Sequence, residues 1–165
     1  MNAQGNEDWG KDADGVRRAG TVTVELAMVL PLLLLLLFGI IEFGWLAQDR
    51  AELGQVAREG ARIAAVGGTP DRITAAIYAN TTTVTDAELT VVYRYRTWDS
   101  SGSSWGGWST LGADGDQNTA QRGDQIQIKL EYPHKLLVPG LMGPVMGADE
   151  NGRVNVSANS VMMRE

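Results

Sequence analysis

An uncharged apolar run from Leu26 to Ile41 constrains this chain more than any other feature of its sequence. A helix that crosses the hydrocarbon core of a bilayer needs about 20 mostly apolar residues, and residues 26–47 supply that length with Glu42 as the only charge. A helix on a soluble protein keeps a polar face, whereas Leu32 to Leu37 puts leucine on every side. The segment is therefore predicted to lie in lipid or among other apolar helices.

The charges on either side of this run predict its orientation. Arg17 and Arg18 precede it, whereas the chain from Asp49 onward carries charges of both signs. Because flanking basic residues tend to stay in the cytoplasm, we expect a cytoplasmic N-terminus and an exported C-terminal part. A cleavable secretory signal is the alternative. Its apolar region is usually about 7 to 15 residues and ends at an A-x-A-like site, whereas this run is longer and leads into the sequence WLAQ at 45–48.

Composition excludes several classes of function. A chain of 165 residues with one membrane span leaves room for one small exported domain and none for a large enzyme. The net charge of −6 and the absence of a basic cluster argue against nucleic acid as a partner. The chain has no cysteine, which excludes disulfides, thiol chemistry and Cys-ligated zinc.

Three segments follow from composition and stop signals. Residues 1–20 are rich in Gly, Asn and acidic residues, which is typical of a disordered leader. One long helix is predicted over 21–66, because its second half holds helix-favouring residues without proline and ends at the Gly-Gly-Thr-Pro sequence of 67–70. At about 1.5 Å per residue this helix is about 65 to 70 Å long, so its second half must leave the lipid. Residues 67–165 form the exported domain.

The exported half of the predicted helix carries small apolar residues at spacings of three and four. This stripe comprises Leu53, Ala57, Ala61, Ala64 and Ala65. Such spacing puts the residues on one face of a helix, which can then pack closely against another element. Two partners stay open, the C-terminal domain of the same chain and a neighbouring subunit.

The exported domain is predicted to have an α+β fold. A short helix is expected over 71–79, with Thr69 as N-cap and Pro70 at the first helical position. Strands are expected over residues 88–96, 125–132 and 153–161, where β-branched and aromatic residues or a period of two dominate. The fold class is thus a long N-terminal transmembrane helix that continues into a small domain, with a short helix and an antiparallel sheet of about three or four strands.

The loop at 98–108 is the most unusual part of this domain. Trp98, Trp105 and Trp108 stand there among Gly and Ser, which gives rigid aromatic surfaces on flexible turns. Exposed aromatic clusters often bind a sugar, a protein or lipid, so the three tryptophans are candidate partner-binding residues. The alternative is that they fold back and cap a thin sheet.

The sequence does not predict catalysis, and no cofactor or metal is expected. His134 is the only histidine and is expected at the end of a strand, so a His-based triad or a metal cluster finds no second member. The glycines and prolines of 138–144 are interpreted as a connection, because no strand and helix frame them as a phosphate loop.

Two carboxylates flank the apolar run, near its two ends. Glu42 is interpreted as facing lipid headgroups, since it lies within two turns of Asp49. Glu25 lies five residues after Gly20. Cleavage after Gly20 would create an amino terminus at Thr21, one helical turn before Glu25, and the carboxylate could then pair with the amine of an adjacent subunit in a low-dielectric bundle.

These residues suggest a family. The sequence GTVTVE at 20–25 resembles a prepilin processing motif, with Gly at the last leader position and Glu at the fifth mature one. Together with LP at 30–31, GIIEFG at 39–44 and AREGAR at 57–62, the chain resembles the TadE-like pseudopilins of the tight-adherence (Tad, type IVc) pilus system. The resemblance covers about residues 17–65. Leu26 departs from it, because many Tad-type prepilins have an aromatic residue there.

The resemblance implies a function and partners. It implies a minor pilin or pseudopilin that assembles a surface pilus for adhesion, with a prepilin peptidase cutting between Gly20 and Thr21, and with other pilins and the assembly platform as partners. The protein would be a single-pass membrane protein with a cytoplasmic N-terminus, which can pass into an extracellular pilus. Two other classes stay open, a permanently anchored envelope protein that binds glycan or a partner through the loop at 98–108, and an exported hydrolase.

Overall fold

The computed structural model describes residues 9–165, and these fall into two compact units with the boundary between Ile41 and Glu42. The longest element, α1, is a helix over Trp9–Ala65 and contributes to both units.

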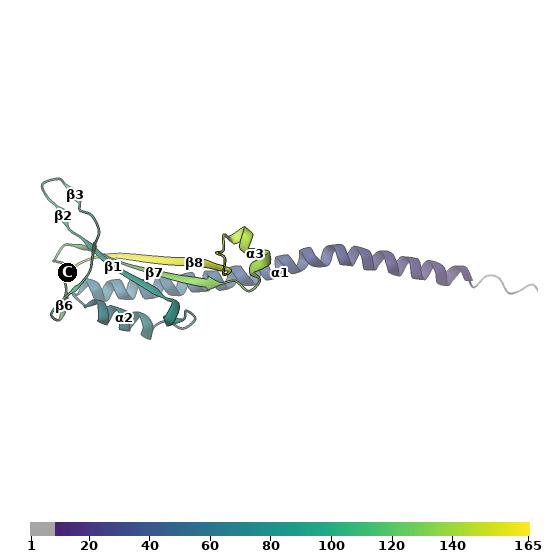
Figure 1. Ribbon diagram of the computed structural model, residues 1–165, viewed down its shortest axis with the longest axis horizontal. Helices are drawn as coiled ribbons and strands as arrows, with labels where there is room; N and C mark the ends of the chain where they lie inside the picture. The colour runs from purple at the N-terminus through teal and green to yellow at the C-terminus, as the bar shows by residue number, and fades with distance from the viewer. Residues whose placement is uncertain (1–8) are drawn as a thin grey trace, which may run out of the picture. The chain divides into compact units, whose positions relative to one another are not determined.

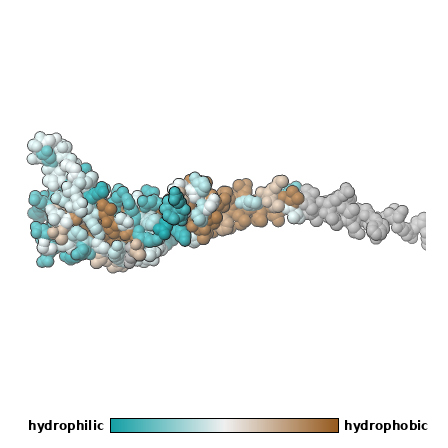
Figure 2. Space-filling view, viewed as in Figure 1, coloured by the Kyte–Doolittle hydropathy of each residue, from teal (hydrophilic) through white to brown (hydrophobic). Residues whose placement is uncertain are grey.

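In the first unit all described residues belong to α1 (Figure 1). The large apolar side chains from Val22 to Leu37 are 38 to 76% exposed. They form a brown stretch in Figure 2, where residues before Val22 are grey. Among the described residues, α1 is the one helix that is long and apolar enough to cross a membrane. The predicted apolar helix is confirmed.

The start of α1 differs from the prediction. The helix begins at Trp9, whereas the sequence analysis assigned 1–20 to a leader without structure and began the helix at Thr21. Residues 9–20 contain no proline and include the helix formers Lys11, Ala13, Arg17 and Arg18. Extending an existing helix avoids the cost of nucleation, so the neighbouring apolar helix allows these turns to form. Residues 1–8 lie outside the described part of the chain.

In the second unit, α1 ends as predicted at the glycine pair. Gly67 adopts a left-handed φ of +96°, its N–H donates to Ala64 O (3.0 Å), and the N–H of Gly68 donates to Ile63 O (2.9 Å). This pair of bonds is the Schellman motif that ends helices at glycine. The side-chain amide of Asn118 donates to Ala64 O at 2.8 Å, so α1 ends with its last carbonyls satisfied.

The short helix α2 spans Pro70–Ala79 and confirms its predicted caps. Thr69 is the N-cap and accepts a bond from the N–H of Arg72 at 3.4 Å, with Pro70 in the first turn. Ile73 and Ile77 are fully buried. A Cβ built on Gly60 of α1 would stand 3.1 Å from Ile77 Cδ1, so the two helices approach closely at this glycine.

A four-stranded antiparallel sheet packs beside α1 in the order β4-β1-β7-β8. Its strands are β1 (Thr90–Arg96), β4 (Ser109–Thr110), β7 (Gln125–Lys135) and β8 (Arg153–Met163). The sheet face toward the helices holds Ile126, Ile128 and Leu130, which are fully buried. The alanine stripe of α1 is buried in the same core, so the C-terminal domain of this chain is the partner of that stripe. The predicted α+β fold is confirmed.

Several short elements connect the main strands. A 3₁₀ turn, η1 (Asp86–Glu88), precedes β1. Two small ribbons form β2 (Trp98–Asp99) with β3 (Ser104–Trp105), and β5 (Ala113–Asp114) with β6 (Gln117–Asn118). Residues 138–144 lie in the connection between β7 and β8, as interpreted, but this connection contains a helix that was not predicted, α3 over Pro139–Met146. Pro139 starts it, Met142 and Gly143 are buried, and Gly147 ends it in the left-handed conformation.

Candidate functional site

The predicted processing and assembly residues lie on α1 in the first unit. Gly20 and Thr21 have a helical backbone, and the side chain of Glu25 is exposed. One helical turn separates Thr21 from Glu25. No neighbouring subunit is present in this structure, so the pairing of Glu25 with an amine stays a prediction.

The second unit contains a buried cluster that the sequence analysis did not find. The imidazole of His134 lies between two carboxylates of α1: Asp49 Oδ2 is 2.6 Å from Nδ1, and Glu42 Oε1 is 3.3 Å from Nε2. Glu42 is fully buried, and its Oε2 accepts a bond from the backbone N–H of Leu137 at 3.0 Å. The interpretation of Glu42 as a headgroup-facing carboxylate is therefore wrong. It faces the protein, where these donors replace water.

The periods of α1 and β7 bring the cluster together. Glu42 and Asp49 are seven residues apart, which is two helical turns, so they share one face of α1 with the buried Leu53. On β7, alternate residues face the helix, and His134 follows Ile128 and Leu130 in this series. The histidine thus takes a core position at the end of the strand, opposite the two carboxylates.

The hydrogen-bond inventory of imidazole explains this arrangement. A neutral imidazole has one donor nitrogen, whereas the protonated ring donates from both. Asp49 has a further partner, because the hydroxyl of Thr83 donates to its Oδ1 at 3.5 Å. Two buried carboxylates are thereby matched by several donors, as buried charges require.

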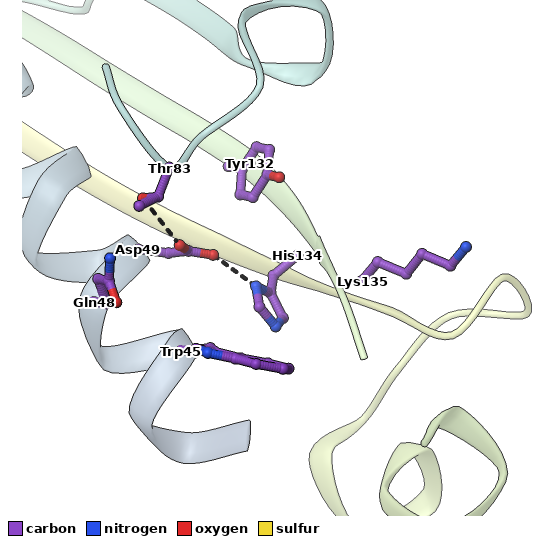
Figure 3. A pocket seen from close by; sticks show the side chains of 7 residues that line it. All are labelled: Trp45, Gln48, Asp49, Thr83, Tyr132, His134 and Lys135. Atoms are coloured by element: carbon purple, nitrogen blue, oxygen red, sulfur yellow. Dashed lines mark hydrogen bonds and ion pairs between the residues drawn. The ribbon is translucent and has the colours of Figure 1, made fainter. Parts of the chain in front are cut away.

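An open hollow of about 390 Å³ adjoins the cluster (Figure 3). It is lined by Trp45, Gln48, Asp49, Thr83, Tyr132, His134 and Lys135. In Figure 3, Asp49 lies between Thr83 and His134, and the side chain of Lys135 extends away from them. The cluster and the hollow lie side by side, where residues 42–49 of α1 meet the end of β7.

The chemistry of the cluster favours a structural tie over catalysis. Nucleophilic catalysis needs a hydroxyl or thiol on the basic nitrogen of the histidine, but both ring nitrogens here face carboxylates. The hydroxyl of Thr83 contacts Asp49 and the side chain of Glu52. Among the described residues, no group of three His, Cys, Asp or Glu side chains could hold a metal ion.

The predicted tryptophan loop forms a hairpin of its own. Trp98 and Trp105 face each other across β2 and β3, with ring centroids 5.2 Å apart at 72°. The guanidinium of Arg96 lies 5.3 Å from the ring of Trp105 and 4.5 Å from that of Trp108. Trp98 is 46% exposed, and none of the three belongs to the hydrophobic core. Figure 1 shows the hairpin of β2 and β3 projecting from the sheet, while Trp105 and Trp108 are half-buried beside Arg96.

Comparison with known proteins places the N-terminal segment. The model of the TadE-like protein family matches residues 20–62. No match is found among curated proteins, and none among solved structures. The match begins at Gly20, includes Glu25 and continues through the apolar run into the second unit. It confirms the resemblance that the motifs of α1 predict, and the segment 20–62 of this chain is TadE-like.

Proposed function

We propose that the protein is a minor pilin or pseudopilin of a Tad-type pilus, which takes part in assembling a surface fibre for adhesion. The observation that carries the proposal is the TadE-like match over residues 20–62, which indicates a Tad pilus-related protein. The helix properties agree with this function. The apolar side chains of α1 between Val22 and Leu37 are exposed on all sides, so this part of the helix can exchange lipid for the helices of neighbouring subunits at modest cost.

In this proposal a prepilin peptidase removes residues 1–20 on the cytoplasmic side of the membrane. The exported part, from about residue 48 onward, is displayed outside. The new amino group of Thr21 then lies one turn from Glu25, whose exposed carboxylate pairs with the amine of an adjacent subunit. Other pilins and the assembly platform are the partners of the mature helix.

Mass spectrometry of the membrane-extracted chain tests the cleavage. In a host that contains the peptidase, we expect the mature chain to begin at Thr21 and the Gly20→Val variant to stay at full length. Gly15→Val is the matched control, because it changes a leader glycine away from the cut and should be processed normally. An intact Met1 in the unmodified chain would contradict the proposal.

The assembly function of Glu25 has a separate test. Glu25→Ala is expected to be cleaved normally but to be lost from purified fibres, because the amine of Thr21 finds no carboxylate. Glu150→Ala removes an exposed carboxylate of the second unit and should leave incorporation unchanged. Native incorporation of Glu25→Ala would show that the pairing is not needed.

A second candidate function rests on the exposed tryptophan hairpin. A permanently anchored envelope protein that binds glycan or a protein partner would use Trp98, Trp105 and Trp108 as its contact surface. This alternative requires an uncut N-terminus, or a cut unrelated to Gly20. The same mass measurement therefore separates the two functions.

A further inference from the structure

Five large apolar side chains of the second unit are exposed near the point where α1 enters this unit. Phe43 and Trp45 lie on α1, and Leu137, Leu141 and Val145 lie on the segment 136–152 that connects β7 to β8. Val145 is 80% exposed, and α3 within this segment contains no charged residue. None of these five side chains belongs to the hydrophobic core of the unit.

The segment 136–152 is held beside the first turn of α1 in this unit. The bond from Leu137 N to Glu42 Oε2 ties the start of the segment directly to residue 42. A bond of 3.0 Å from Leu136 N to Gly152 O closes its base, where β7 ends and β8 begins. Figure 1 shows α3 beside α1 at this end of the sheet. The exposed residues of α1 and of 136–152 therefore lie at one level of the helix.

The length of the apolar run shows what lies at that level. At about 1.5 Å per residue, residues 26–41 span about 24 Å, which is less than the hydrocarbon thickness of about 30 Å. The candidate span begins at Val22, and residues 22–41 reach about 30 Å, so Glu42 follows at the outer boundary of the core. Tryptophan is enriched at that boundary, where Trp45 lies. Glu42 has donors from His134 and Leu137, so its charge needs no water from the boundary.

We propose that α3 and Leu137 lie in the lipid headgroup region, so that the second unit rests on the outer surface of the bilayer. The contact would consist of Phe43, Trp45, Leu137, Leu141 and Val145. Binding at a lipid interface grows with the apolar area that enters it, and these five exposed side chains supply such area beside an anchored helix. A specific protein interface needs about 1,200 Å² or more, which a helix of eight residues does not supply. The inference rests on the proposed insertion of α1 into a membrane.

Because the chain has no cysteine, single spin labels can test the proposal in the full chain. Val145→Cys places a label on α3, Val161→Cys places one on an exposed position of β8, and Leu36→Cys places one in the apolar run. Each labelled chain is put into nanodiscs of phosphatidylethanolamine and phosphatidylglycerol, with one chain per disc. Collisions of the label with oxygen, which concentrates in lipid, are compared with collisions with a water-soluble nickel chelate.

We expect the Val145 label to collide more with oxygen and less with the nickel chelate than the Val161 label does. Equal exposure of both labels to nickel, with the Leu36 label protected, overturns the interfacial contact and leaves the membrane anchor intact. Nickel access at Leu36 overturns the anchor itself. Protection of Val145 that arises only with several chains per disc also overturns the proposal, because a second copy is then the partner of α3.

Discussion

At the scale of single residues, His134 matters most because it is the shared partner of two buried carboxylates. His134→Ala removes the hydrogen-bond partner that Glu42 and Asp49 share and leaves both carboxyl groups buried. Removing one partner from a buried charged group costs about 3 to 5 kcal/mol. We expect the free energy of unfolding of the second unit to fall by an amount in this range. Urea unfolding of the full chain in detergent micelles, followed by circular dichroism, measures it.

Lys135→Ala is the matched control for this prediction. Lys135 is the next residue of β7, and its side chain is exposed and extends away from the cluster. Substitutions at such positions change the unfolding free energy by about 0.5 kcal/mol or less. If His134→Ala were as mild as Lys135→Ala, water entering the adjacent hollow would be solvating the two carboxylates, and the cluster would contribute little to stability.

At the scale of elements, local signals predicted most of the fold. Thr69 and Pro70 give the start of α2, the glycine pair after Val66 gives the end of α1, and the period of two in β7 and β8 marks both strands. Each signal depends on the residue's own backbone or on its nearest neighbours. The helix α3 was missed because Gly140, Gly143 and Pro144 have low helix propensity, and its stability comes from burial and caps instead.

The candidate site was harder to predict than the elements that carry it. His134 meets Glu42 and Asp49 only because β7 lies at a particular position along α1. No local sequence signal predicts that position. A trace of it is present in the sequence. The helix face of Leu53 continues back to Asp49 and Glu42, and the inward series of β7 continues forward to His134. Polar residues that continue the core-facing pattern of a helix and of a strand could have suggested that the two meet in a buried contact.

The packing of α2 on α1 gives a prediction for a pair of elements. Gly60 faces Ile73 and Ile77 of α2, and a Cβ on it would already be 3.1 to 3.3 Å from their side chains. Gly60→Leu inserts a whole side chain into this contact, and overpacking of this kind costs about 1 to 3 kcal/mol. We expect a loss of that size in the unfolding free energy, together with faster hydrogen exchange of the α2 amides.

The same substitution two turns earlier in α1 is the control. A Cβ on Gly54 would meet only the mobile end of Arg58, at 3.6 Å. Because leucine favours a helix over glycine by nearly 1 kcal/mol, Gly54→Leu should leave the unit as stable or make it more stable. Equal losses for Gly54→Leu and Gly60→Leu would mean that α1 tolerates leucine poorly in general, and that close packing against α2 is not the cause.

At the scale of the whole molecule, the second unit separates its stable core from its tryptophan hairpin. The buried core lies between α1, α2 and the sheet, and its cluster contains none of the three tryptophans of the hairpin. The hairpin is held by contacts among its own residues and Arg96. An aromatic pair contributes about 0.5 to 1.5 kcal/mol, and an exposed cation–π contact about 0.5 to 1 kcal/mol. These contacts order the hairpin without supporting the sheet.

This division predicts that the tryptophans can be removed without unfolding the unit. The triple variant Trp98→Ala, Trp105→Ala and Trp108→Ala should lower the free energy of the main unfolding transition by less than about 1 kcal/mol, as surface changes do. Ile128→Ala, in the buried series of β7, should lower it by about 2 to 5 kcal/mol. Urea unfolding of both full-length variants, followed by circular dichroism, compares the two losses. A triple variant as unstable as Ile128→Ala would mean that the tryptophans support the sheet. A small loss would mean that the hairpin can change in sequence while the fold persists.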